Sequence, residues 1–441
     1  MAVVDCLREF IAEKQLLSHQ DRVLLAVSGG KDSMLMAYVF KAMGYDAIVA
    51  HCNFQLRGKE SDLDEELVRE FAETLQFPFF VNHFDTEAHA TLHKISIQMA
   101  ARELRYTWFE ALRQQEGCAV IAIGQHANDQ VETVLLNLTR TTGIQGLTGI
   151  KPKQGQVIRP LLELSAEQVR KAVEEYNIPF RDDQSNFSTK YARNKIRLEI
   201  IPKFEEIQPH FAEIMLQNIA HFEESYGFIQ DHVSRLRDQL FTEQGGWIFL
   251  EKDQLKAHIP SAYLFFELLK PFGFLKSTLE DVLQVLDREM GQRFESPSHE
   301  LLLDRNQLLI RRKKEAGSAQ MTWHLSEETL AWHDRVFSMR PEEIIGYSLG
   351  MDNVQVDAAL LQFPLTIRTW QLGDYFVPLG MSGRKKVSDF FIGLKINRFE
   401  KEEIPLLING NGEVIWIVGK RLDNRYRVTE NTKKVLTLVC K

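Results

Sequence analysis

Cysteine is scarce in this chain, and the four cysteines that it has stand far apart. Cys6, Cys52, Cys118 and Cys440 form no CxxC pair. This spacing argues against a structural zinc site, an iron–sulfur cluster and a disulfide framework. Unpaired cysteines are typical of proteins in a reducing compartment, so we expect the cytoplasm.

Long hydrophobic runs are also missing. The longest, such as residues 120–123 and 414–418, are far below the roughly 20 apolar residues that a membrane helix needs. Asp5 and Glu9 interrupt the first residues, which therefore indicate an amphipathic helix rather than a signal peptide. We expect no membrane segment. With 441 residues, 44% of them hydrophobic, the chain is expected to form two or three domains.

Positive charge is lacking overall but not locally. The chain has a net charge of -8 at pH 7, which by itself disfavours a nucleic-acid partner. Residues 381–441 nevertheless hold thirteen Lys and Arg against seven Asp and Glu, a local excess of about +6. The C-terminal end is therefore expected to be a basic module on an acidic protein.

The first 200 residues or so alternate short apolar runs with helical patterns, which is typical of a parallel sheet wrapped by helices. We predict a doubly wound α/β catalytic domain over residues 1–210, with ligands at the carboxyl ends of its strands. Strands are expected at residues 23–27, 47–53, 77–83 and 119–124, and helices at 60–76 and 97–114.

Two further domains are expected after it. Residues 211–315 have mainly helical patterns, interrupted by a strand at 247–250 and a hairpin through 300–312, and predict a small, mainly helical middle domain. The charged stretch 311–315 is expected to begin a linker, with a solvated face as the alternative. Residues 316–441 combine turns with short β-type runs at 365–370, 414–418 and 435–439. They predict a mixed α/β domain, with a mainly β domain as the alternative.

The nucleotide-binding patterns GxxxxGK[ST] and GxGxxG are both absent, which disfavours an ordinary kinase, GTPase or dehydrogenase. Residues 23–33 instead read VLLAVSGGKDS, an apolar strand followed by a glycine turn and a helix. Such a turn presents backbone N–H groups, and the helix N-terminus adds about half a positive charge, so phosphate is the natural ligand. A glycine turn that merely joins strand to helix is the alternative.

This loop resembles the SGGxDS loop of the N-type ATP pyrophosphatases, which split ATP between its α and β phosphates. The resemblance implies nucleotide contacts at Ser28, Gly29, Gly30, Lys31, Asp32 and Ser33. A carboxylate beside a triphosphate repels it unless a cation lies between them, so Asp32 is expected to bind Mg²⁺ together with ATP. The alternatives are a carboxylate favoured by the helix dipole at Asp32 and a plain N-cap at Ser33.

Further segments resemble the tRNA(Ile)-lysidine synthetases and span almost the whole chain. They are HCNFQLRGKESDLDE (51–65), AARELRY (100–106), GQHANDQVET (124–133), LTRTTGIQGLTGI (138–150), RPLL (159–162), DDQSNFSTKYARNKIR (182–197), IRTWQLGDYFVPLGMSGRKKVSDFF (367–391) and VIWIVGKRLDNRYRV (414–428). The thiolating relatives lack the C-terminal segments. The combination of SGGKDS with these segments is therefore the strongest discriminator.

The resemblance also implies site residues outside the loop. Asp129 is expected to be a second Mg²⁺ ligand, and Arg105, Arg193 and Arg197 are candidates for contacts with phosphate or RNA. Ordinary ion pairs are the alternative for each arginine. Three positions depart from the family pattern, with Gln125 in place of a histidine, Asn128 in place of an aspartate and Thr141 in place of a glycine.

Other residue types are expected to be structural. His51, His83 and His126 lack metal-ligand spacing, so we expect satisfied structural histidines. Phe390, Phe391 and Phe399 are expected in a core rather than in base-stacking platforms.

The implied function is the conversion of the wobble cytidine of an isoleucine tRNA with a CAU anticodon into lysidine. ATP adenylates the cytidine with release of pyrophosphate, and free L-lysine then displaces AMP. The middle domain and the basic residues Arg384, Lys385 and Lys386 are expected to grip the tRNA.

A thiolase of the same superfamily and a non-catalytic RNA-binding protein are the alternatives. Cys52 and Cys118 fall inside expected strands, which argues against a thiolase. The presence of both metal carboxylates argues against a dead enzyme. The oligomeric state, a homodimer included, stays open.

Overall fold

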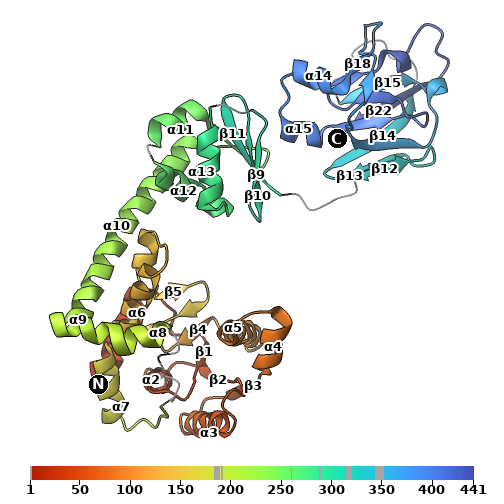
Figure 1. Ribbon diagram of the computed structural model, residues 1–441. Coiled ribbons are helices and arrows are strands. Elements are labelled where there is room, and N and C mark those ends of the chain that lie inside the picture. Colours follow the sequence, from red (N-terminus) through yellow and green to blue (C-terminus); the bar gives the residue numbers. More distant parts are fainter. Residues whose placement is uncertain are drawn as a thin grey trace. The chain divides into compact units, whose positions relative to one another are not determined.

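The computed structural model describes residues 2–182, 189, 192–259, 261–287, 290–313, 320–342 and 352–441. The chain forms two compact units, residues 1–229 and 230–441, and helix α10 (Phe211–Leu240) crosses from one into the other (Figure 1). Most of the expected linker and part of the motif at 182–197 lie outside the described residues. The three-domain division at 210 and 315 stays a prediction.

The first unit is built on a six-stranded sheet in the order β3-β2-β1-β4-β6-β5. β1 pairs in parallel with both β2 and β4, and only β5 runs antiparallel to its neighbour. The strands are β1 (Val23–Ala26), β2 (Ala47–Asn53), β3 (Phe79–His83), β4 (Val120–Ile123), β5 (Lys153–Gln154) and β6 (Val157–Ile158). The four strands predicted from the sequence and their parallel arrangement are confirmed.

Helices cover both faces of this sheet (Figure 1). They are α1 (Ala2–Glu13), α2 (Lys31–Ala42), α3 (Lys59–Thr74), α4 (Thr86–His93), α5 (Ile97–Gln115), α6 (Ala127–Leu138), α7 (Ala166–Glu175), α8 (Ala192–Lys195) and α9 (Ile201–Ile207). The expected helices at 60–76 and 97–114 correspond to α3 and α5.

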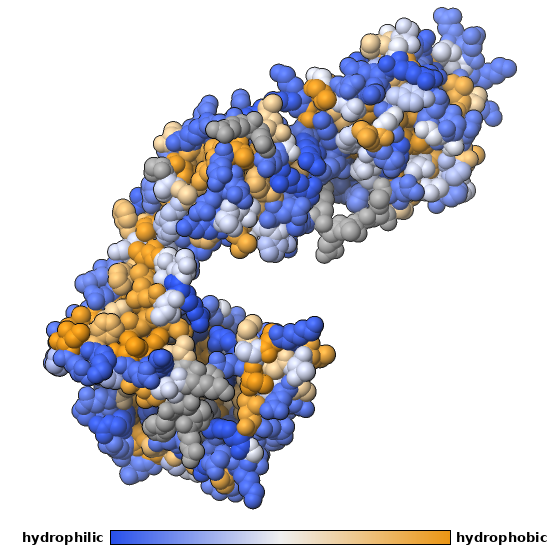
Figure 2. Space-filling view, viewed as in Figure 1, coloured by the Kyte–Doolittle hydropathy of each residue, from blue (hydrophilic) through white to orange (hydrophobic). Residues whose placement is uncertain are grey.

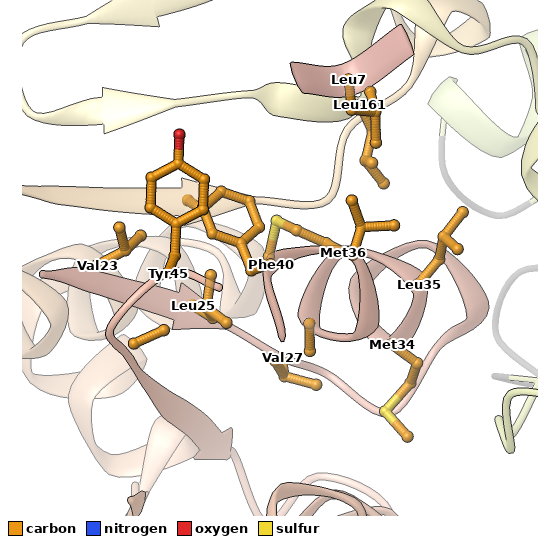
Figure 3. Close-up of a cluster of buried hydrophobic side chains, with 14 of the residues drawn as sticks. Leu7, Val23, Leu25, Val27, Met34, Leu35, Met36, Phe40, Tyr45 and Leu161 are labelled. Carbon is orange, nitrogen blue, oxygen red and sulfur yellow. The ribbon is translucent and has the colours of Figure 1, made fainter. Parts of the chain in front are cut away.

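Successive residues of β1 supply two separate cores. Val23 and Leu25 belong to a cluster that includes Phe40 of α2 and Leu7 of α1 (Figure 3). Leu24 points to the opposite face, in a cluster with residues of α5. A parallel strand in the middle of a sheet is buried on both faces, so every residue of β1 is apolar.

The second unit contains an antiparallel sheet in the order β7-β8-β11-β10-β9 with three helices. Its elements are β7 (Thr242–Gln244), β8 (Trp247–Glu251), α11 (Lys252–His258), α12 (Ala262–Leu269), α13 (Lys276–Val285), β9 (Arg293–Glu295), β10 (His299–Leu303) and β11 (Gln307–Arg312). The predicted strand and hairpin are present, although the sheet is larger than the helical pattern suggested. Arg311 and Arg312 lie in β11, so the charged stretch begins inside a strand rather than in a linker.

The rest of the second unit is a mixed α/β structure. Two antiparallel sheets, β12-β16-β19-β20-β21 and β13-β14-β22-β15, share a core that contains Trp323, Trp416 and Phe337. Its elements are β12 (Gln320–Trp323), β13 (Thr329–Trp332), β14 (Arg335–Glu342), β15 (Asn353–Asp357), β16 (Leu365–Thr369), β17 (Tyr375–Phe376), β18 (Lys385–Lys386), α14 (Val387–Gly393), α15 (Arg398–Glu403), β19 (Pro405–Ile408), β20 (Val414–Ile417), β21 (Arg421–Leu422) and β22 (Val435–Cys440). The predicted strands at 365–370, 414–418 and 435–439 are confirmed.

Apolar side chains gather on α9 and the first turns of α10 (Figure 2). Ile200, Phe204, Ile207 and Ile214 are all exposed there. No helix in the described part of the chain, α10 included, is long and apolar enough to cross a bilayer.

One glycine holds the end of β4 against the phosphate loop. A Cβ on Gly124 would lie 2.9 Å from the backbone nitrogen and Cα of Ser33. We expect Gly124→Ala to lower the free energy of unfolding by about 1–3 kcal/mol, because the backbone must move apart. It should also weaken ATP binding, since the loop shifts.

Gly227→Ala is the matched control, because nothing lies within 4 Å of the added Cβ and alanine favours a helix. Chemical denaturation and ATP titration measure both variants. Equal stability of the two would show that the close approach does not constrain the loop.

Candidate active site

The loop between β1 and α2 has the shape of an anion cradle. Gly29 has a φ of 92°, a conformation that glycine adopts without strain. Gly30 is the N-cap of α2, so the reading of Ser33 as an N-cap is wrong. The Ser33 hydroxyl donates to the Gly30 carbonyl at 3.0 Å and accepts from the Ser28 N–H at 3.0 Å. Ser33 therefore holds the turn from within, while Ser28 is exposed.

The two expected metal carboxylates lie on neighbouring helix starts. Asp32 is in the first turn of α2 and Asp129 in the first turn of α6. These helices follow β1 and β4, which are adjacent and parallel, so both side chains reach the same edge of the sheet. The sheet topology thus brings together residues almost a hundred positions apart.

His126 lies between these carboxylates. Its Nε2 is 3.9 Å from Asp32 Oδ2, and its Nδ1 is 3.9 Å from Asp129 Oδ2. A satisfied structural histidine was expected at His126, but among the described residues its Nδ1 is buried without a hydrogen-bond partner. His51, by contrast, has its Nδ1 2.9 Å from the Val27 carbonyl oxygen, as expected of a structural histidine.

Burial disfavours the charge of Asp32 and raises the pKa of its carboxyl group, and the nearby Asp129 adds to this, against the opposing effects of His126, Lys31 and Arg197. In the described part of the chain, Asp32 Oδ1 and His126 Nδ1 are buried without a hydrogen-bond partner. An unpartnered, desolvated carboxylate oxygen fits a cation. The described residues contain no group of three or more His, Cys, Asp and Glu that could hold a metal alone. Mg²⁺ fits this arrangement because it is usually held by one or two carboxylates with water and phosphate.

Glu132 is a site residue that sequence reasoning missed. Its side chain is 2% exposed, and it accepts from Arg193 Nε at 2.7 Å and from Arg197 Nη2 at 3.0 Å. Arg193 Nη2 also donates to Asp129 Oδ1 at 2.8 Å. One sequence signal could have pointed to Glu132. Asp129 and Glu132 are three residues apart and so share one face of a helix, and Arg193 and Arg197, four residues apart, share one face of another.

The arginine pair comes from a distorted helix. α8 runs directly into a π-turn at Ile196–Ile200 before α9 begins. Such bulges are frequent at functional sites. The distortion places Arg193 and Arg197 beside the carboxylates of Asp129 and Glu132. Both arginines therefore form ion pairs in this structure, which was the alternative to contacts with phosphate or RNA.

Arg105 is not part of this cluster among the contacts of the described residues. It is exposed on α5, with its Cζ 5.2 Å from the centre of the Phe54 ring. Nearby, burial raises the pKa of the Cys52 thiol to about 12. Cys52 is therefore protonated at neutral pH and does not suit the nucleophile of a thiolase.

The departures from the family pattern have local roles. The Gln125 side chain accepts from Arg159 Nε at 2.7 Å, and Asn128 Oδ1 accepts from the Ala166 N–H at 2.8 Å. Thr141 is not among the described residues with positive φ, so its backbone does not require a glycine.

In the second unit, Arg384 and Lys386 are exposed and Lys385 is half-buried. Phe390, Phe391 and Phe399 are buried, as expected.

Comparison with known proteins gives a match along the whole chain. The family models are the PP-loop domain over residues 3–204, the TilS substrate binding domain over 225–313 and the TilS substrate C-terminal domain over 365–438. The tRNA(Ile)-lysidine synthase of Parabacteroides distasonis is 38% identical over 98% of this chain and 99% of its own. That of Bacteroides thetaiotaomicron is 34% identical over 97% of each chain.

The chain belongs to the tRNA(Ile)-lysidine synthase family. This confirms the family and the α/β fold that the motifs predicted, and with a PP-loop domain it confirms the use of ATP. The match to the tRNA(Ile)-lysidine synthases extends through the C-terminal residues. These residues contain the segments expected to distinguish this family from the thiolating relatives.

We expect Asp32→Asn to separate stability from activity. A raised pKa in the folded state means that ionised Asp32 costs folding free energy at any pH above the unfolded pKa of about 3.9. Without metal and nucleotide, the variant should melt above the parent at pH 7, with the difference vanishing below about pH 4. AMP formation should be lost because a cation ligand is removed.

Asp129→Asn is the matched control with the opposite sign. It weakens the pair with Arg193 and the hydrogen bond from the His126 N–H, so it should melt below the parent and also lose AMP formation. Thermal melts between pH 4 and 8 and an AMP assay test both. An Asp32→Asn variant that melts below the parent at pH 7 would contradict the unfavourable burial of this charge.

Proposed function

We propose that this protein joins free L-lysine to C2 of the wobble cytidine of an isoleucine tRNA, in the cytoplasm and at the expense of ATP. The observation that supports it most is the lysidine-synthase match over nearly the full chain, together with paired carboxylates beside the phosphate loop. The non-catalytic alternative does not account for the unpartnered carboxylate oxygen of Asp32.

In the first step, the cytosine O2 attacks the α-phosphorus of ATP, the bond to the β-phosphate oxygen breaks and pyrophosphate leaves. The Gly29–Gly30 turn and the N-terminus of α2 bind the phosphates, and Lys31 adds positive charge. Asp32 and Asp129 would hold Mg²⁺, which neutralises charge on the phosphate oxygens. Arg193 and Arg197 orient Asp129 and Glu132.

In the second step, the ε-amine of lysine attacks C2, the bond from C2 to the adenylated oxygen breaks and AMP leaves. The amine must be deprotonated when it attacks. The base must be unpaired to enter, as bases in single-stranded loops are.

The two steps can be separated experimentally. With ATP labelled at the α-phosphate and no lysine, label should transfer to a tRNA transcript with a CAU anticodon, and added lysine should release it as AMP. A transcript with uridine at the wobble position is the control and should stay unlabelled. Labelled lysine incorporated without ATP, or no transfer to the cytidine transcript, would overturn the proposed reaction.

The basic module is proposed to grip tRNA phosphates. In the described part of the chain, no ion pair joins Arg384, Lys385 or Lys386 to a carboxylate. Changing all three to alanine should weaken tRNA binding and reduce its salt slope by up to about three, one for each lost phosphate contact.

The matched control is Arg170→Ala with Lys171→Ala, two exposed cations of α7 that pair with glutamates. tRNA titration at several salt concentrations compares the variants, and ATP affinity should stay unchanged in both. An unchanged salt slope in a well-folded triple variant would remove these residues from the RNA interface.

A further inference from the structure

Tyr375, an aromatic residue shortly before the basic residues 381–441, faces solvent. Tyr375 is 37% exposed, whereas the next residue, Phe376, is fully buried. Both lie in β17, which pairs with β18 so that Tyr375 stands opposite Lys386. Alternate residues of a strand point to opposite faces. The Phe376 side chain therefore packs into the core, and the Tyr375 side chain points toward solvent.

Two guanidinium groups lie close to this ring. The Cζ of Arg384 lies 4.6 Å from the ring centre and that of Arg425 lies 6.0 Å from it. Arg425 is held in place, because its Nη2 donates at 2.8 Å to Asp423, which is fully buried. Arg384 is exposed and has no carboxylate partner among the described residues. Arg425 is therefore held by a buried carboxylate, whereas Arg384, the nearer of the two cations to the ring, is not paired in this way.

Exposed apolar residues lie close to Tyr375 in the sequence. Leu372 is 93% exposed, and Leu379 and Met381, in the turn between β17 and β18, are 39% and 54% exposed. A surface that binds only duplex phosphates needs cations alone. A ring with exposed apolar neighbours and arginines matches the sites at which proteins stack unpaired bases.

We propose that Tyr375 and Arg384 bind an unpaired nucleotide of the tRNA outside the anticodon loop. The base stacks on the Tyr375 ring, and the Arg384 guanidinium contacts the adjoining phosphate. This inference rests on the proposed tRNA grip of the module and adds that the module recognises single-stranded RNA by stacking as well as by charge. The nucleotide comes from the unpaired 3′ end or from another loop.

The test measures tRNA affinity of the full chain at several salt concentrations. Tyr375→Leu should weaken binding on the order of tenfold with an unchanged salt slope, because stacking releases no counterions. Tyr375→Phe and Tyr375→Trp keep a ring and should bind as the parent does. Arg384→Gln should instead reduce the slope by about one.

A transcript without its unpaired 3′ end locates the base. If Tyr375→Leu causes no further loss with this transcript, the base belongs to the 3′ end, and if the loss persists, it belongs to a loop. Parent-like affinity of Tyr375→Leu, or equal losses in the Phe and Trp variants, would overturn the stacking site. If the triple variant loses salt slope while Tyr375→Leu binds normally, only the stacking fails and the phosphate grip stands.

Discussion

The burial of negative charge at the edge between β1 and β4 is the constraint on which the site depends. Two adjacent parallel strands bring the first turns of α2 and α6 together, and each turn contributes an aspartate. Glu132 follows one turn later and is almost completely buried. Carboxylates in a low-dielectric setting need counter-charges. Arg193 and Arg197 supply them for Asp129 and Glu132, which ties a helix near residue 200 to the phosphate loop.

The buried carboxylates are not equally neutralised by positive charge, and this difference suggests different roles for Glu132 and Asp32. Glu132 accepts hydrogen bonds from both arginines, so its charge is already matched and its main effect is to orient them. Among the described residues, Asp32 Oδ1 has no hydrogen-bond partner, and burial raises the pKa of the Asp32 carboxyl group. A cation therefore gains most beside Asp32.

Local pattern was enough to predict the sheet and the glycine turn between β1 and α2, because each depends on residues close together in sequence. The metal-binding roles of Asp32 and Asp129 stay predictions, and Asp129 was expected only from the family resemblance. The role of Glu132 could not be predicted from local pattern, since its partners come from more than sixty residues later in the chain. Arg311 shows the same limit. Its charged neighbours suggested a solvated linker, but it lies in β11 and pairs at 2.8 Å with Glu300. A charged side chain is rarely buried unless an oppositely charged partner lies beside it in the fold. A short stretch of sequence does not show which residue that partner is.

The C-terminal module shows the same principle for aromatic residues. Phe390, Phe391 and Phe399 pack into cores, as their apolar side chains require. Tyr375 also has a large aromatic side chain and is next to Phe376 in the sequence. Tyr375 is nevertheless exposed, whereas Phe376 is buried. In a two-residue strand no periodicity exists from which the outward face can be read. Only the pairing of β17 with β18 decides it, and that pairing sets the one exposed ring beside Arg384. Composition thus indicates that the module is basic, whereas the strand pairing determines where a base has a surface on which to stack.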